Sequence, residues 1–192
     1  MTLKTCSGFV LSKSSTYNSD FVIFLLSDRG ALVKLLAKRK VFEKFSSLIL
    51  ETNLVVVAFD DRYKIPILKD ISVVSSNYDF LSCFDNLGFC FLVIEILLTI
   101  AKEGLENEKL FSASKEFFSS RKRVKDAAVN FVSDILLSEG LVSPDTLLEI
   151  KTLSKTDLDG GEEIREKNVL KSLLDKFESV LDLKLSSKVL VA

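Results

Sequence analysis

Residues 21–37, Phe-Val-Ile-Phe-Leu-Leu-Ser-Asp-Arg-Gly-Ala-Leu-Val-Lys-Leu-Leu-Ala, decide the fold. Residues 21–27 form a continuous apolar run, which is typical of a strand that is buried on both faces. Residues 28–30, Asp-Arg-Gly, predict a three-residue hairpin turn, because the glycine can adopt a left-handed conformation. Residues 31–37 return as a second strand, and alternation places Lys34 on the face opposite its Val and Leu neighbours.

Further strand patterns lie on both sides of this hairpin. Residues 4–12 predict a strand before it, and residues 47–59, rich in Leu, Ile and Val, predict one after it. A second tight turn at residues 60–62 leads into a return strand at 63–68, where Pro66 indicates an edge strand or a strand end. Five short strands joined by hairpin turns predict a small β-barrel, and an OB-fold is one such barrel.

From about residue 77 onward the hydrophobic period becomes helical. The fold class is therefore α+β, with an OB-fold domain at 1–76 followed by an all-α helical domain at 77–192. Gly140 and the pair Ser143-Pro144 fit a helix end and a helix start. The predicted helices cover residues 87–104, 106–119, 124–140, 144–153 and 164–181, with a turn-rich linker at 154–161.

Charge is unevenly distributed along the chain. The whole chain has a net charge of −1, but residues 1–75 carry 11 Lys and Arg against 7 Asp and Glu, a net of +4. Residues 76–150 carry 7 against 12, a net of −5. A basic first module favours a face that binds a polyanion, and ordinary surface scatter is the alternative.

The sequence lacks residues and motifs that several classes of enzyme require. The chain has no histidine, which excludes Ser-His-Asp and Cys-His machinery and a Cys/His zinc site. No glycine-rich phosphate loop is present to support ATP use. Cys6, Cys83 and Cys90 are widely spaced among apolar residues, as buried free thiols in a reducing cytosol would be. We therefore expect a non-enzyme that needs no cofactor and no metal.

The N-terminus and the most apolar segment bear on localisation. Residues 1–4, Met-Thr-Leu-Lys, lead directly into a strand pattern without the apolar region of a signal peptide. Residues 87–101 fall short of the roughly 20 apolar residues that cross a bilayer, and Glu95 interrupts them. We interpret them as a core helix and expect a soluble, cytoplasmic protein without a membrane partner.

The main candidates for a binding site are the cations in and beside the basic run of the first module. They can neutralise phosphates and release counterions, which gives salt-dependent binding without base readout. The alternative is a solvated loop that follows a strand. These candidate DNA-binding residues are Arg29, Lys34, Lys38, Arg39, Lys40 and Lys44.

A second group of cations, Arg121, Lys122, Arg123 and Lys125, opens the predicted helix at 124–140. Cations at a helix N-terminus oppose the helix macrodipole, so a compensating partner is expected there. Phosphate is one such partner, and nearby carboxylates are another. We include these four residues among the candidate DNA-binding residues.

Aromatic rings are the usual second component of single-strand binding, because bases stack on them. Tyr17, Phe42, Phe45 and Tyr63 are the candidates near the predicted barrel. Phenylalanines at alternating positions more often belong to a hydrophobic core.

The order of several short motifs resembles the RecO family of DNA-repair recombination mediators. At the front, Gly8-Phe-Val-Leu, the hairpin at 20–30 and the Leu35-Leu-Ala-Lys-Arg stretch follow the family's order. In the middle, residues 89–100 with Glu95 are similar to the helix that follows the family's barrel. Near the end, residues 183–190 are similar to its closing pattern. No single motif is diagnostic, and the resemblance depends on their order and spacing.

The resemblance implies a non-enzymatic mediator that binds single- and double-stranded DNA and anneals complementary strands. It also implies that the protein acts with RecR to load RecA onto DNA coated by single-strand-binding protein, which would contact the helical domain. Two other interpretations remain open. One is a protein-interaction scaffold with weak DNA binding, and the other is a small-barrel RNA-binding protein.

The chain departs from the family pattern in two places. The family usually carries a four-cysteine zinc-binding insertion in its helical domain, but residues 137–161 contain no cysteine. Arg39 stands where the family has a glycine after Ala37-Lys38. The resemblance is therefore to a shortened, zinc-free form, and any role of the zinc element elsewhere in the family is in doubt here.

Overall fold

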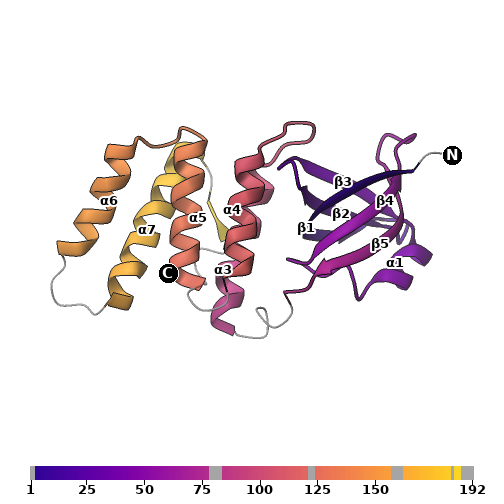
Figure 1. The fold of residues 1–192 in the computed structure, drawn as a ribbon, viewed down its shortest axis with the longest axis horizontal. Coiled ribbons are helices and arrows are strands. Elements are labelled where there is room, and N and C mark those ends of the chain that lie inside the picture. The colour runs from indigo at the N-terminus through magenta and orange to yellow at the C-terminus, as the bar shows by residue number, and fades with distance from the viewer. Residues whose placement is uncertain (1–2, 78–83, 121–123, 157–161, 183, 187–192) are drawn as a thin grey trace. The chain divides into compact units, whose positions relative to one another are not determined.

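The computed structural model describes residues 3–77, 84–120, 124–156, 162–182 and 184–186. Over these residues a five-stranded closed barrel is followed by helices, which confirms the predicted α+β class (Figure 1). Internal contacts divide the chain into two compact units. One unit holds Met1–Asp79 together with Leu97–Phe111, and the other holds Phe80–Ile96 and Ser112–Ala192.

The barrel has the strand order β1-β2-β3-β5-β4. Its neighbouring strands pair antiparallel, except that β3 and β5 are parallel and pair at Leu36 and Ile67. The parallel contact lets the last strand close the barrel instead of leaving two open edges. The strands are β1 (Lys4–Ser15), β2 (Phe21–Ser27), β3 (Leu32–Ala37), β4 (Leu54–Asp60) and β5 (Ile67–Ser75).

The β2–β3 hairpin forms at the predicted position. Phe21 pairs with Ala37 and Leu26 with Leu32, so the two strands are in register along their length. Gly30 has a φ of 75°, which is the left-handed conformation that the turn was predicted to need. The Ser27 backbone N–H donates to the Ala31 carbonyl at 2.9 Å and closes the turn.

Inward-facing side chains fill the barrel. Leu35 is fully buried and Val33 packs against the same core, whereas Lys34 between them is half-buried on the outer face. This alternation agrees with the prediction from the sequence. The buried cluster consists of Val10, Ile23, Leu25, Leu35, Ala37, Phe45, Ile49, Val55, Val57, Leu68 and Ile71.

The basic run is not a loop: residues Arg39–Phe45 form helix α1, which was not among the predicted helices. Val41, Phe42 and Phe45 lie on one face of this helix and pack against the barrel core. Apolar residues at this spacing favour a helix once a core is present to receive them. Figure 1 shows α1 beside the barrel, near β5, and the two elements are in contact.

The segment at 97–111 belongs to the barrel unit and runs beside the β2–β3 hairpin. The Leu32 backbone N–H donates to the Lys102 carbonyl at 3.1 Å. The Asn107 N–H donates to the Arg29 carbonyl at 2.8 Å. These bonds satisfy backbone groups of the hairpin that would otherwise lack a partner at the start of β3.

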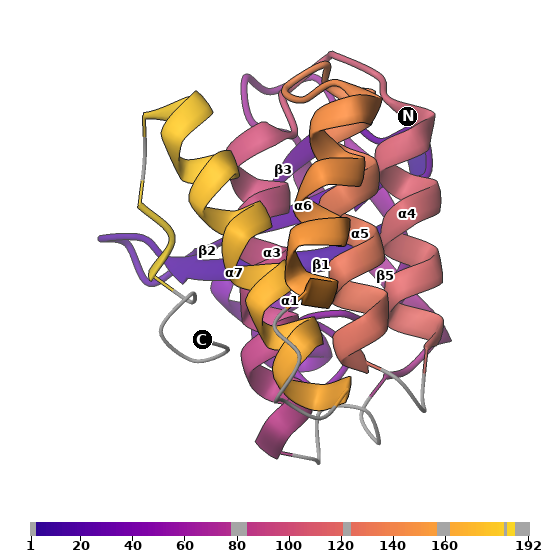
Figure 2. The same ribbon diagram turned by 90° about the vertical axis from the view of Figure 1, so that its left-hand side faces the viewer.

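The helices beyond the barrel follow the predicted order. Helix α7 packs against both α5 and α6 (Figures 1 and 2). The Thr146 backbone N–H donates to Ser143 Oγ at 3.1 Å, which confirms the predicted N-cap. Among the residues that the structure describes, no helix has the length and apolar content required to cross a membrane. The helices are α3 (Phe84–Ile100), α4 (Glu108–Ser119), α5 (Val124–Ser138), α6 (Pro144–Thr156) and α7 (Glu162–Leu181).

Candidate nucleic-acid interface

Two loops meet the chain where β3 ends and α1 begins. The loop between β1 and β2 ends at Asp20, whose carboxylate holds Lys38 and the backbone of Arg39. The loop between β4 and β5 ends at Pro66, whose carbonyl accepts the Leu36 N–H at 2.8 Å. The α1 end of the barrel is defined here as these two loops, residues 16–20 and 61–66, together with residues 38–44.

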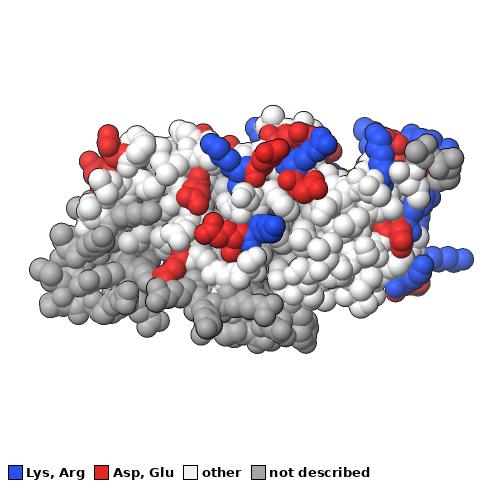
Figure 3. All heavy atoms as spheres, in the orientation of Figure 1, with Lys and Arg blue, Asp and Glu red and all other residues white. Residues whose placement is uncertain are grey.

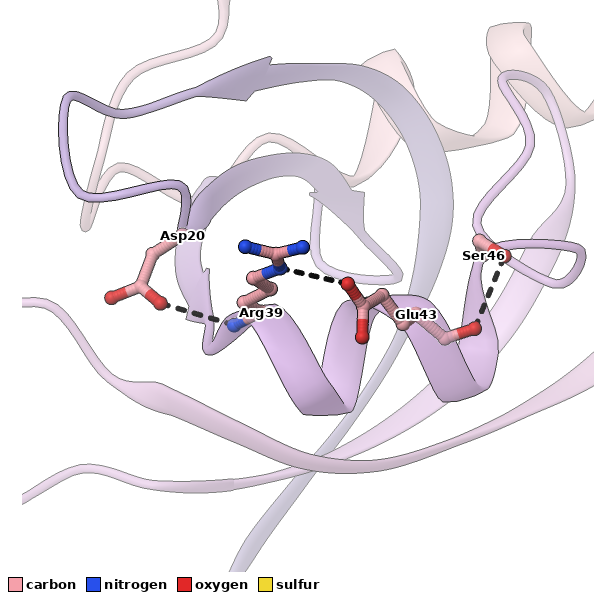
Figure 4. A network of polar contacts seen from close by, with 4 residues as sticks. All are labelled: Asp20, Arg39, Glu43 and Ser46. Carbon is pink, nitrogen blue, oxygen red and sulfur yellow. Dashed lines mark hydrogen bonds and ion pairs between the residues drawn. The ribbon is translucent and has the colours of Figure 1, made fainter.

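Asp20 joins the first of these loops to α1 (Figure 4). Its carboxylate accepts the Arg39 backbone N–H at 3.0 Å and Lys38 Nζ at 2.7 Å. The hydrogen bond from Lys38, followed by that from the Arg39 backbone, lowers the pKa of Asp20. Asp20 thus satisfies one of the free N–H groups at the start of α1 from 19 residues earlier in the chain.

Arg39 is also paired within α1. Its Nε donates to Glu43 at 2.8 Å, one helical turn further on, and both side chains are more than half exposed. Water screens such exposed pairs, so they hold a cation only weakly against a competing anion. Lys38 and Arg39 are therefore compensated within the protein, yet they remain accessible to phosphate.

Three further cations at the α1 end lack such a partner. Lys40 and Lys44 on α1 and Lys64 on the β4–β5 loop are exposed, and none forms an ion pair within the described part of the chain. The Lys44 Nζ lies 4.4 Å from the centroid of the Phe45 ring. In Figure 3 the Lys and Arg atoms of the barrel gather along its right-hand edge, with a few carboxylates among them.

Arg29 and Lys34 do not belong to this group. Arg29 lies in the β2–β3 turn and pairs with Glu106 at 3.0 Å, and Lys34 on β3 pairs with Glu103. Both glutamates come from the 97–111 segment that runs beside the hairpin. Hydrogen bonding to Glu106 raises the pKa of Arg29. Two of the predicted site residues thus lie away from the α1 end, each in an ion pair with a glutamate.

Of the second predicted group the structure describes Lys125, which lies in the other compact unit. Lys125 is half-buried in the first turn of α5. Arg121, Lys122 and Arg123 lie outside the residues that the structure describes. Their predicted role in DNA binding stays a prediction.

The polar contacts of the β4–β5 turn were not predicted from the sequence. Arg62 donates through Nε and Nη2 to both carboxylate oxygens of Asp60, at 2.9 and 2.7 Å. Asp60 is only 2% exposed, and these bonds from Arg62 lower its pKa to about 2. The pair fixes the turn that carries Tyr63 and Lys64. The signal in the sequence was Arg62 and Lys64 flanking an aromatic residue directly after a tight turn.

Asp60 is expected to make stability depend on pH in the acid range. The folded state lowers its pKa from 3.8 to about 2, so its contribution is fully present above pH 3.8 and is lost as the pH falls through 2. Urea unfolding from about pH 5 to about pH 2 measures this loss. The difference in unfolding free energy between wild type and Asp60→Asn should shrink over that range, and a constant difference would contradict the pairing with Arg62.

The four aromatic candidates separate into two classes. Phe42 stacks on Phe21 with ring centroids 3.6 Å apart, and Phe45 is 8% exposed, so both rings belong to the core. Tyr17 is fully exposed in the β1–β2 loop, and Tyr63 is 53% exposed in the β4–β5 loop. Of the four, the two tyrosines present exposed rings.

Burial shifts the pKa of the two described cysteines. Burial raises the pKa of Cys6 to about 11, with a smaller effect from Asp28, and burial raises that of Cys90 to about 12. Neither cysteine is disulfide-bonded, and Cys83 lies outside the described residues. Within the described ranges, no three Cys, Asp or Glu side chains come together in a way that could hold a metal ion.

No family model matches the chain, and no curated protein matches its sequence at a significant level.

Proposed function

We propose that this protein is a RecO-like mediator of DNA repair and recombination. In this proposal it binds single- and double-stranded DNA and anneals complementary strands without enzymatic chemistry. With RecR it helps to load RecA onto DNA coated by single-strand-binding protein, and it acts in the cytoplasm. The helical unit would provide the surface for its protein partners.

The arrangement of charge at the α1 end carries the DNA-binding part of the proposal. Lys40, Lys44 and Lys64 have no ion-pair partner among the described residues, and the two weakly held cations Lys38 and Arg39 lie beside them. A strand of nucleic acid placed there would release counterions from its phosphates. A positive face that holds one strand also lowers the repulsion that a complementary strand meets.

We further propose that the barrel is of the OB type. Its strand order, its parallel β3–β5 closure and the position of α1 between β3 and β4 support this assignment. OB-folds bind oligonucleotides with the face of strands 2 and 3 and with the β1–β2 and β4–β5 loops. Those two loops are the ones that flank the α1 end here.

A scaffold with weak DNA binding is the second candidate function, and one observation favours it. Lys38, Arg39, Arg29 and Lys34 all have carboxylate partners within the protein. Each internal pair reduces the charge available to phosphate. In this alternative, binding to other proteins is the main function and nucleic acid contributes little.

Binding of a fluorescent oligonucleotide across a salt series tests the proposal. We expect affinity to fall steeply from about 0.05 to 0.2 M salt, because about five cations at the α1 end contact phosphates. The slope of log K against log salt should be about −3.5 for single-stranded DNA, about −0.7 for each of the five contacts. Absence of binding at low salt would favour the scaffold, and preference for RNA over DNA would favour an RNA-binding barrel. A strand-annealing assay without ATP then tests the proposed activity.

A further inference from the structure

Two exposed tyrosines occupy the two loops of the α1 end. Tyr17 is fully exposed in the β1–β2 loop, and Tyr63 is 53% exposed in the β4–β5 loop. Tyrosine rings more often bury most of their surface, since the ring is largely apolar. Other rings of the barrel, such as Phe21, Phe42 and Phe45, pack against the core. Folding of the barrel does not account for the exposure of Tyr17 and Tyr63.

Backbone and side-chain hydrogen bonds hold both loops. The Thr16 N–H donates to the Asp20 carbonyl at 2.7 Å and the Ser19 N–H to the Thr16 carbonyl at 3.0 Å, so Tyr17 lies on a closed turn. The Arg62 side chain, directly before Tyr63, is held by two hydrogen bonds to Asp60. Rings on ordered loops lose little conformational freedom when they bind a ligand.

The contacts of these loops place them on either side of the same segment. The first loop reaches residues 38–39 through the Asp20 carboxylate, and the second reaches Leu36 through the Pro66 carbonyl. Between them, Val22 and Leu36 face outward as a half-buried cross-strand pair at this end of β2 and β3. The two loops that carry the exposed rings therefore lie on either side of the end of β3, where α1 with Lys40 and Lys44 begins.

We propose that the α1 end selects single-stranded nucleic acid by stacking unpaired bases on Tyr17 and Tyr63. This inference rests on the proposed nucleic-acid binding and adds that the preferred ligand is single-stranded. Unpaired bases have free faces that stack on an aromatic ring, whereas the bases of a duplex are already stacked on one another. Lys40, Lys44 and Lys64 hold the backbone of the same strand, so charge gives affinity and the tyrosines give the preference for single strands.

Three ligands of about 15 nucleotides separate stacking from charge: an oligothymidine, an abasic strand with the same backbone, and a duplex. The test variant combines Tyr17→Ala with Tyr63→Ala, and its control combines Tyr17→Phe with Tyr63→Phe. We expect the alanine variant to bind the oligothymidine about 100-fold more weakly, about tenfold for each ring. Its affinity for the abasic strand and the duplex should stay close to that of wild type. The phenylalanine variant should bind all three ligands as wild type does.

Tyrosine fluorescence provides a direct second readout. The chain has no Trp and 3 Tyr, so quenching by a stacked base is not masked by tryptophan. We expect the oligothymidine to quench wild-type emission more strongly than the abasic strand does, and the phenylalanine variant to lose this difference. If wild type binds the oligothymidine and the alanine variant binds it equally well, stacking is wrong and nucleic-acid binding stands. If wild type binds none of the ligands, both proposals fail.

Discussion

A variant that combines Lys40→Gln, Lys44→Gln and Lys64→Gln is expected to bind single-stranded DNA about 100-fold more weakly than wild type at 0.1 M salt. Each lysine that contacts a phosphate contributes about 0.7 to the salt dependence of log K, which corresponds to about fivefold in affinity at this salt concentration. Three such contacts account for the expected loss, and the slope should become shallower by about 2. Fluorescence anisotropy across a salt series measures both quantities.

A matched control removes the same charge from the same compact unit, outside the α1 end. Arg29→Gln, Lys102→Gln and Lys109→Gln also delete three exposed cations, none of which lies at the α1 end. We expect the affinity of this variant to fall only a few-fold, through the change in long-range field. Equal losses for the two triple variants would show that net charge, and not the α1 end, determines binding. Urea unfolding of both variants checks that neither loss arises from misfolding.

Gly30→Ala is expected to destabilise the barrel unit by about 3 kcal/mol or more. Gly30 has a φ of 75°, and the left-handed conformation costs other residues about 1–2 kcal/mol. A Cβ at this position would lie 1.8 Å from the Asn107 carbonyl oxygen, so the 97–111 segment must also move away from the hairpin. Forcing an atom into a packed site costs about 1–3 kcal/mol more. Urea unfolding followed by circular dichroism measures the loss against a total stability of about 5–15 kcal/mol for a typical domain.

Alanine variants of two other glycines in the same unit separate the conformational cost from the steric cost. Gly104 has a φ of 73°, and a Cβ added there would meet no atom within 4 Å, so Gly104→Ala should show only the conformational cost of about 1 kcal/mol. Gly8 is not left-handed, but its Cβ would lie 2.4 Å from the Leu26 carbonyl oxygen, so Gly8→Ala tests steric overlap alone. A Gly30→Ala cost no larger than that of Gly104→Ala would contradict the close packing of the hairpin against Asn107.

Local patterns in the sequence were sufficient to predict the β2–β3 hairpin and several helix ends. The Gly30 turn and the Ser143 N-cap depend on residues within a few positions of one another, and both are confirmed. Helix α1 was missed because its start depends on Asp20, which lies far back in the sequence. The spacing of Val41, Phe42 and Phe45 was a helical signal within the basic run, but the high density of charge around them favoured a loop.

The sequence was sufficient to locate the basic residues of the candidate site. It was not sufficient to predict which of them form ion pairs in the folded protein. Lys40 and Lys44 were named from the run itself, and they remain exposed and without ion pairs among the described residues. Arg29 and Lys34 were named for the same reason, but their neutralisation by Glu106 and Glu103 depends on contacts across about 70 residues of chain. Only the folded structure brings those charges together, so charge counting along the sequence could not separate the two groups.

The central claim is that the α1 end of the barrel binds nucleic acid. Titration of isotope-labelled protein with an oligothymidine, followed by the backbone amide NMR signals, tests it most directly. The claim predicts that the largest shifts fall in residues 16–20, 38–44 and 61–65, with little change at the Arg29 turn or in α5–α7. Shifts confined to the hairpin turn or to the helices, or no shifts at low salt, would contradict it.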